Sequence, residues 1–228
     1  MLKQYLRLNK MDFLLLALVP AGGLLLLELA HALGNGLTDD HAVLYLGSLI
    51  FPLIAGGLAL FAAIGQVTLT YDQSVKLGRT RRETVACVLA LCLIEGVFAF
   101  AAAGVCTWVE GLLGDYFWPA LYPDALPEII FRNIFPLWGQ ALAAVVCPLA
   151  GLASGALIHR FGRRAFWVIW FAWMALFLTV SNVDHDRVDQ LVRGLGLDLL
   201  PVLLWAGGIL LAGLTLWGVR YLLHAAVK

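Results

Sequence analysis

The sequence predicts an all-α, polytopic integral membrane protein with six transmembrane helices. Of its 228 residues, 62% are hydrophobic and only 13% are charged, and the mean hydropathy is +0.89, well above that of an ordinary soluble domain. Apolar runs long enough to cross a bilayer recur along the whole chain. Little of the chain is left for a soluble catalytic domain, so we expect a single six-helix membrane domain over residues 1–228.

Six apolar runs define the expected spans. They lie at 13–33, 42–65, 84–112, 133–158, 165–182 and 199–222. The third run is longer than a bilayer requires, so we expect this helix to tilt or to project beyond the membrane.

The basic residues indicate the orientation of the spans. Twelve of the fifteen lysines and arginines lie near the two termini, between spans two and three, or between spans four and five. Short cytoplasmic loops retain Lys and Arg. Both termini and the 66–83 loop are therefore expected in the cytoplasm, and the 114–130 loop outside. The expected location is the inner (cytoplasmic) membrane.

Amphipathic helices are expected at the N-terminus and between spans five and six. The N-terminal segment MLKQYLRLNKMDF interleaves apolar and basic residues, which suits a helix lying in the membrane interface; an ordinary basic anchor is the alternative. Between spans five and six, Val188, Leu191, Val192 and Leu195 have helical spacing, which predicts a short outer helix. The DHD triplet at 184–186 predicts no metal site, because consecutive helical residues point in different directions and no second ligand cluster is evident.

The polar segment YDQSVKLGRTRRE, residues 71–83, interrupts the apolar chain between spans two and three. Three apolar residues fall on or near one side of about two helical turns: Tyr71, Val75 and Leu77. Gly78 can end this short helix. Thr80 and Glu83 have capping-box spacing, which predicts the start of the third span. We expect a small helix lying across the membrane surface; a solvated basic loop that only sets topology is the alternative.

The basic amphipathic N-terminus, the six spans and the LGRTRRE loop leading into span three together resemble the permease subunit of an ABC-2 type (type V) ABC transporter. The matched local motif is SVKLGRTRRE, residues 74–83, and the architecture covers the whole chain. In that family, a coupling helix before the third span docks onto the ATPase. The commoner family pattern has an acidic residue and a GT pair earlier in the loop, where this chain has TYDQS.

The resemblance implies a set of residues that dock the ATPase subunit. They are Tyr71, Asp72, Ser74, Val75, Lys76, Leu77, Gly78, Arg79, Thr80, Arg81 and Arg82. It also implies a separate ATPase subunit that binds ATP and Mg, a second permease subunit, identical or homologous, and export of a hydrophobic or amphipathic substrate. This chain lacks the P-loop, HExxH and GxSxG motifs. We therefore expect no enzymatic activity and no cofactor in this chain, and no nucleic-acid partner.

Ionisable residues inside spans are costly in lipid and usually face protein, water or a partner. Glu95 shares a helix face with small residues, which favours close helix packing. These neighbours are Cys92, Gly96, Ala99, Ala103 and Cys106. The Glu95 carboxyl has either a structural role or a place along a transport path. Glu28 and His31, three residues apart on span one, form either a local hydrogen bond or a proton relay.

Two other classes of protein remain open. A proton-coupled secondary transporter would use Glu28 and Glu95 as coupling groups, although the chain has no evident internal repeat and no pair of broken spans to host a site. A non-transport membrane protein, such as an assembly factor or sensor, would use the basic loop to bind a partner.

Overall fold

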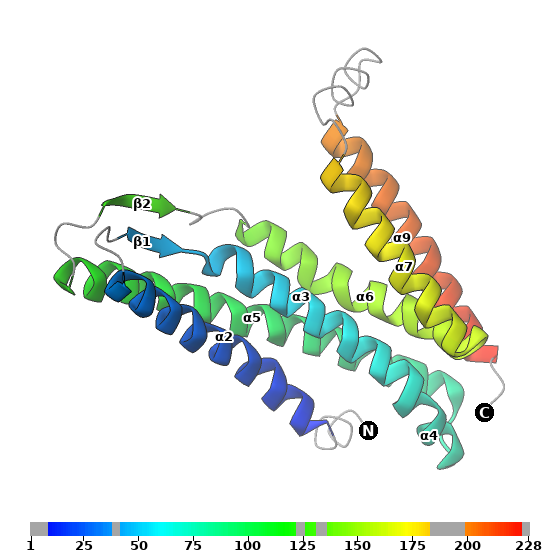
Figure 1. Cartoon of the computed structure of the whole chain (residues 1–228). Coiled ribbons are helices and arrows are strands. Elements are labelled where there is room, and N and C mark those ends of the chain that lie inside the picture. Colours follow the sequence, from blue (N-terminus) through cyan, green and yellow to red (C-terminus); the bar gives the residue numbers. More distant parts are fainter. Residues whose placement is uncertain (1–8, 38–41, 122–125, 131–135, 183–198, 225–228) are drawn as a thin grey trace. The chain divides into compact units, whose positions relative to one another are not determined.

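The computed structural model describes residues 9–37, 42–121, 126–130, 136–182 and 199–224 (Figure 1). Long helices dominate this part of the chain. They are α2 (Lys10–Leu37), α3 (Gly47–Gly65), α5 (Arg81–Leu121), α6 (Leu137–Phe161), α7 (Arg163–Asn182) and α9 (Leu199–His224). The shorter elements are strand β1 (Ala42–Tyr45), the π-helix η1 (Gln66–Thr70), helix α4 (Tyr71–Lys76) and strand β2 (Leu126–Ile130).

Five helical stretches of the described chain are long and apolar enough to cross a membrane. They are Lys10–Leu37, Gly47–Lys76, Arg81–Phe117, Leu137–Phe161 and Trp205–His224. These five match five of the six expected spans, so the multi-pass membrane class is confirmed by length and composition. Residues 165–182, expected as the fifth span, form the 20-residue helix α7, which is not among the five.

The second span begins later than expected, because residues 42–45 form β1 instead of helix. This strand pairs in parallel with β2, with Ala42 opposite Leu126 and Tyr45 opposite Ile130. A four-residue apolar segment is compatible with either strand or helix, so the pattern alone could not decide. Helix α3 starts at Gly47, whose backbone N–H donates to the carboxylate of Glu110 on α5.

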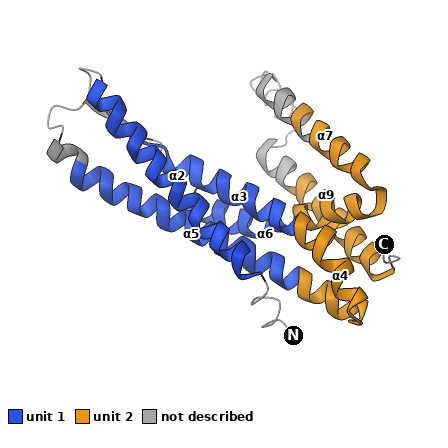
Figure 2. Cartoon of the chain, turned by 60° about the horizontal axis from the view of Figure 1, so that its bottom comes forward, with its two compact units in different colours: residues 1–63, 89–148 blue, residues 64–88, 149–228 orange. Residues whose placement is uncertain are grey.

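The described chain forms two compact units, drawn in different colours in Figure 2. Unit 1 comprises residues 1–63 and 89–148, and α2, α3, α5 and α6 contribute to its core. The core residues are mostly small: Leu16, Phe51, Ala55, Ala59, Ala99, Phe100, Ala103, Cys106 and Ala144. Small side chains let helix backbones approach closely in a membrane. At Gly96, a Cβ atom would lie 2.4 Å from the Ala144 carbonyl oxygen, so only glycine fits there.

Unit 2 comprises residues 64–88 and 149–228. Two glycines allow close packing around α6. A Cβ atom on Gly155 would lie 2.8 Å from the Val67 Cβ of η1, and one on Gly218 of α9 would lie 3.2 Å from the Ala156 Cβ. Gly162 joins α6 to α7 with a φ of +73°, a conformation that costs glycine little and other residues more.

Two predicted elements lie outside the described residues. One is the interfacial helix expected at the N-terminus, of which only residues from Asn9 onward are described. The other is the outer helix expected between spans five and six, together with the DHD triplet at 184–186.

Candidate functional site

The segment expected to form a separate coupling helix is the end of a longer helical stretch. Helix α3, η1 and α4 follow one another without a break from Gly47 to Lys76. Gly65 does not interrupt them, because it has helical angles (φ −59°, ψ −45°). Single-turn π segments inside helices are rare and are frequent at functional sites. The stretch ends at Lys76 with Leu77 as its C-cap, and Gly78 has a φ of +84°, so Gly78 makes the predicted break.

The predicted start of the third helix is confirmed, with one difference in its cap. Helix α5 begins at Arg81, and the Glu83 amide donates to the Thr80 hydroxyl oxygen at 3.4 Å. The Thr80 hydroxyl in turn donates to the Glu83 carboxylate at 2.8 Å. The carboxylate therefore accepts from the Thr80 hydroxyl, whereas in a capping box the acidic side chain accepts from the backbone amide of the cap residue.

Residues 77–80, which we call the α4–α5 turn, lie at the surface of unit 2. Leu77 is 83% exposed, and Lys76 and Arg82 on either side of the turn are exposed as well. Arg79 and Arg81 are partly buried. The turn therefore combines one exposed apolar side chain with flanking positive charge.

Tyr71 is not available to an external partner. Its side chain is fully buried within the chain, and its hydroxyl donates to the backbone carbonyl of Leu222 on α9. Ser74 is buried as well, while Asp72 and Val75 are partly buried. The expectation that the Tyr71 side chain docks onto an ATPase is therefore wrong, because helical spacing located its face of the helix but not what covers that face.

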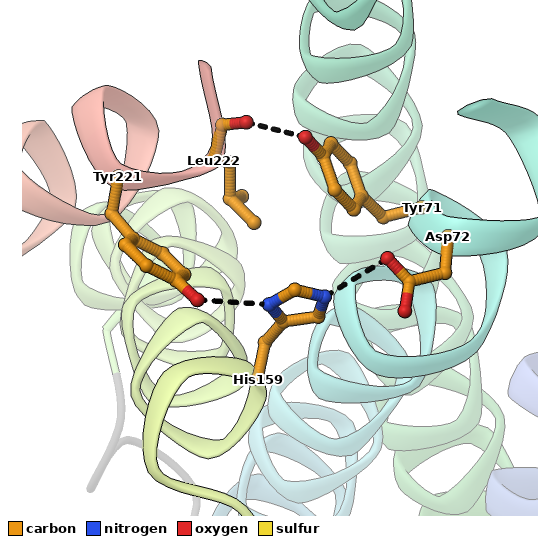
Figure 3. Close-up of polar contacts among 5 residues, drawn as sticks. All are labelled: Tyr71, Asp72, His159, Tyr221 and Leu222. Atoms are coloured by element: carbon orange, nitrogen blue, oxygen red, sulfur yellow. Dashed lines mark hydrogen bonds and ion pairs between the residues drawn. The ribbon is translucent and has the colours of Figure 1, made fainter. Parts of the chain in front are cut away.

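Tyr71 belongs to a polar group that we call the tyrosine–histidine cluster: Tyr71, Asp72, His159 and Tyr221, with the Leu222 carbonyl (Figure 3). The His159 Nε2 lies 3.0 Å from the Asp72 Oδ1, and the His159 Nδ1 lies 3.2 Å from the Tyr221 hydroxyl. An ionised carboxylate only accepts hydrogen bonds, so Nε2 donates to Asp72. In the neutral ring, Nδ1 then accepts from Tyr221.

The cluster joins three segments that are distant in sequence. Asp72 and Tyr71 lie on α4, His159 on the last turn of α6, and Tyr221 and Leu222 near the end of α9. The Tyr71 and His159 rings also meet edge to face, with centroids 5.6 Å apart. Buried polar groups that are fully paired fix one arrangement of the elements that carry them. The base of the α4–α5 turn is therefore tied to both α6 and α9.

An open groove of about 480 Å³ runs beside the cluster. Its lining residues are Ile64, Thr68, Asp72, Ile158, His159, Gly162, Arg163 and Phe166. Four of the eight are apolar, and the other four are polar or charged, among them the Asp72–His159 pair and Arg163. Among the residues the structure describes, no three His, Cys, Asp or Glu side chains come together in a way that could hold a metal ion.

Glu95 is buried in unit 1, as its sequence neighbours predicted. The side chain is 0% exposed, and Cys92, Ala99 and Ala103 on the same face are also buried. Gly96, beside it, packs against the Ala144 backbone. The burial of Glu95 is confirmed, and its place along a transport path stays a prediction.

Glu28 and His31 are partly buried on α2, and both make interactions within the structure. Glu28 lies close enough to Glu110 on α5 to interact with it electrostatically. Their pairing with each other stays a prediction.

Glu110 is a buried acid that was not among the predicted site residues, and it caps the start of α3. Its carboxylate accepts hydrogen bonds from the Gly47 amide at 2.9 Å and from the Leu46 amide at 3.1 Å. These are among the N–H groups that lack a partner at a helix start, where the helix dipole also favours negative charge. The available signal was an acidic residue inside an apolar run. His159, at the end of another such run, carried a similar signal.

No family model matches this chain, and no curated protein or solved structure shows significant similarity to it. Its function is therefore inferred from its own residues and contacts.

Proposed function

We propose that this chain is the transmembrane subunit of an ATP-binding-cassette transporter of the ABC-2 (type V) class. In this proposal, α7 is the fifth of six spans, and both termini lie on the cytoplasmic side of the cytoplasmic membrane. A separate ATPase subunit binds the α4–α5 turn and hydrolyses ATP with Mg. Two permease chains, identical or homologous, enclose the path of a hydrophobic or amphipathic substrate that is exported.

The observation that carries this proposal is the contrast between the tip and the base of the α4–α5 turn. At the tip, Leu77 is 83% exposed. At the base, Tyr71 bonds to α9 and Asp72 bonds to His159 on α6. A displacement of the turn is thus passed directly to α4 and α5, which flank it. Through the side-chain bonds it is also passed to α6 and α9. An element that transmits the closing of an ATPase to membrane helices requires both properties.

The basic residues around the turn also support its role as a docking element. Lys76 and Arg82 are exposed, and Arg79 and Arg81 are partly exposed. They suit acidic groups on a cytoplasmic protein or lipid phosphates. The exposed apolar anchor is Leu77, in place of the buried Tyr71, so Leu77 is the residue to test.

The experiment compares two leucines of equal exposure. Leu77→Ala removes the anchor at the turn, and Leu137→Ala, at an 84% exposed leucine that begins α6, is the matched control. A leucine side chain buried at an interface contributes about 2 kcal/mol, so Leu77→Ala weakens ATPase binding roughly 30-fold. The measurement is the ABC ATPase retained on tagged, membrane-inserted protein purified from its own host, with its ATP hydrolysis.

The control should retain the ATPase as wild type does. If Leu77→Ala and Leu137→Ala retain the same amount of ATPase and support the same ATP hydrolysis, the turn does not dock the ATPase and serves only to set the topology. Absence of any ABC ATPase from the wild-type preparation removes the basis of the proposal.

A proton-coupled secondary transporter is the second candidate, because Glu95 is a fully buried carboxyl inside a membrane-length helix. Transport driven by a proton gradient without ATP, and lost in Glu95→Gln, supports that reading. Transport by neither route leaves a membrane assembly factor or sensor as the function of the chain.

A further inference from the structure

A second groove in unit 2, of about 420 Å³, lies where α6 and α9 end. It is lined by Arg160, Trp217, Arg220, Tyr221 and His224. Of its five lining residues, two are arginines and three carry aromatic rings, and none is acidic. We call it the arginine–aromatic groove.

The aromatic rings hold Arg160 in place. Its guanidinium carbon lies 5.4 Å from the centroid of the Trp217 ring, 5.8 Å from that of Tyr221 and 5.0 Å from that of Phe161. The Trp217 and Tyr221 rings are stacked, with centroids 5.7 Å apart and planes at 9°. Cation–π contacts orient a guanidinium through its face and leave its N–H groups, which lie at its edge, for an acceptor.

The two arginines have no acidic partner among the residues that the structure describes. Asp72, an acid of the same unit, is paired with His159. Both Arg160 and Arg220 are exposed, and neither forms an ion pair in the described chain. Two arginines on the wall of one groove, with no carboxylate beside them in the described part of the chain, form a candidate anion site.

The position of the groove along the helices indicates which anion it meets. Residues Leu137–Phe161 and Trp205–His224 are both membrane-length apolar stretches, and the groove lies at their C-terminal ends. Trp and Tyr side chains at the ends of such helices mark the level of the lipid headgroups. One turn before Arg220, Leu216 is 70% exposed, which offers an apolar surface for acyl chains next to the groove.

We propose that the arginine–aromatic groove binds an anionic phospholipid of the cytoplasmic leaflet by its headgroup phosphate. Arg160 and Arg220 donate hydrogen bonds to the phosphate oxygens, and Trp217 and Tyr221 contact the glycerol region. The cytoplasmic leaflet follows from the strong bias of lysines and arginines to this side of the chain. Basic pockets between membrane helices on that side are suited to anionic headgroups. This inference requires membrane insertion and does not depend on the transport class.

The test is lipid binding to the full chain, purified in mild detergent and measured by native mass spectrometry. Phosphatidylglycerol and phosphatidylcholine are added at equal concentration to wild type and to the Arg160→Gln, Arg220→Gln double variant. Each arginine at an anionic lipid surface contributes about 1 kcal/mol, so the double variant should bind phosphatidylglycerol roughly 30-fold more weakly. The Arg163→Gln, Arg164→Gln variant, which removes the same charge next to the groove residues, should keep the wild-type preference.

Two further measurements cover a Gln variant that does not fold and a groove that binds a free phosphate ester in place of a lipid. The charge-preserving Arg160→Lys, Arg220→Lys variant should keep most of the preference, and it supports the site even where the Gln variant does not fold. Soluble glycerol phosphate at millimolar concentration should not displace the lipid. Equal binding of both lipids by wild type overturns the proposal, as does an equal loss in the Arg163, Arg164 control. Displacement by glycerol phosphate would instead assign the groove to a free phosphate ester.

Discussion

Removal of a single oxygen atom tests the bond that ties the base of the α4–α5 turn to α9. The Tyr71 hydroxyl donates to the carbonyl of Leu222, which lies in the last turn of α9. Carbonyl groups there have no donor within their own helix. Tyr71→Phe keeps the buried ring and its edge-to-face contact with His159, and it removes only the donor.

The expected loss of stability follows from the burial of both bonding partners. Tyr71 and Leu222 are both 0% exposed, so water cannot replace the lost donor without a rearrangement. A buried acceptor without a partner costs about 1–3 kcal/mol. For a chain of this size, this lowers the midpoint of thermal unfolding by roughly 2–12 °C, at about 2–4 °C per kcal/mol.

The assay follows the reaction of a thiol-sensitive fluorophore with the purified full chain in detergent during heating. The four free cysteines, two of them buried, are the reporters. Tyr116→Phe is the matched control, because Tyr116 is 80% exposed and its change should shift stability by less than about 0.5 kcal/mol. Coincident unfolding curves for Tyr71→Phe, Tyr116→Phe and wild type would refute the reasoning.

Three further predictions concern orientation and the buried acids. Tyr116→Cys and Lys76→Cys place single cysteines at two exposed positions in a cysteine-free background. An impermeant thiol reagent added to intact cells should label the cysteine at position 116 and spare the one at position 76. The opposite result reverses the predicted topology. Glu95→Gln should fold nearly as wild type does because an amide can imitate a buried carboxyl, whereas Glu95→Leu should not; a Leu variant that assembles and transports normally would contradict a role for this group. Glu110→Ala should lower the free energy of unfolding by roughly 3–6 kcal/mol, since it removes the acceptor of two backbone amides and hydrogen bonds to charged groups contribute about 1.5–3 kcal/mol each. Glu110→Gln should lower it by less. Unchanged thermal unfolding of the Ala variant would show that α3 starts without this carboxylate.

Local signals predicted the helices well. A membrane helix needs a continuous apolar run of about 20 residues, and such a run is visible without knowledge of any contact. The start of α5 at Arg81 and the break at Gly78 were also predictable. A capping pair and a glycine with positive φ act within a few residues of chain. The burial of Glu95 followed from the small residues on its own helix face.

Such local signals could not predict the contacts between segments that are distant in sequence. The sequence shows that Tyr71 lies on the apolar side of α4, but only the fold decides that α9 covers it and that its hydroxyl meets Leu222. The same holds for His159, which lies 87 residues from its partner Asp72, and for Glu110, which lies 63 residues from the helix start at Gly47. Hydropathy and helical periodicity depend on neighbours along the chain, whereas the pairing of buried polar groups depends on which helices pack together. The sequence alone therefore determined a multi-helix membrane protein with a basic turn before its third long helix, and tertiary packing decided that the base of this turn is bonded to α6 and α9 and that Leu77 remains at its surface.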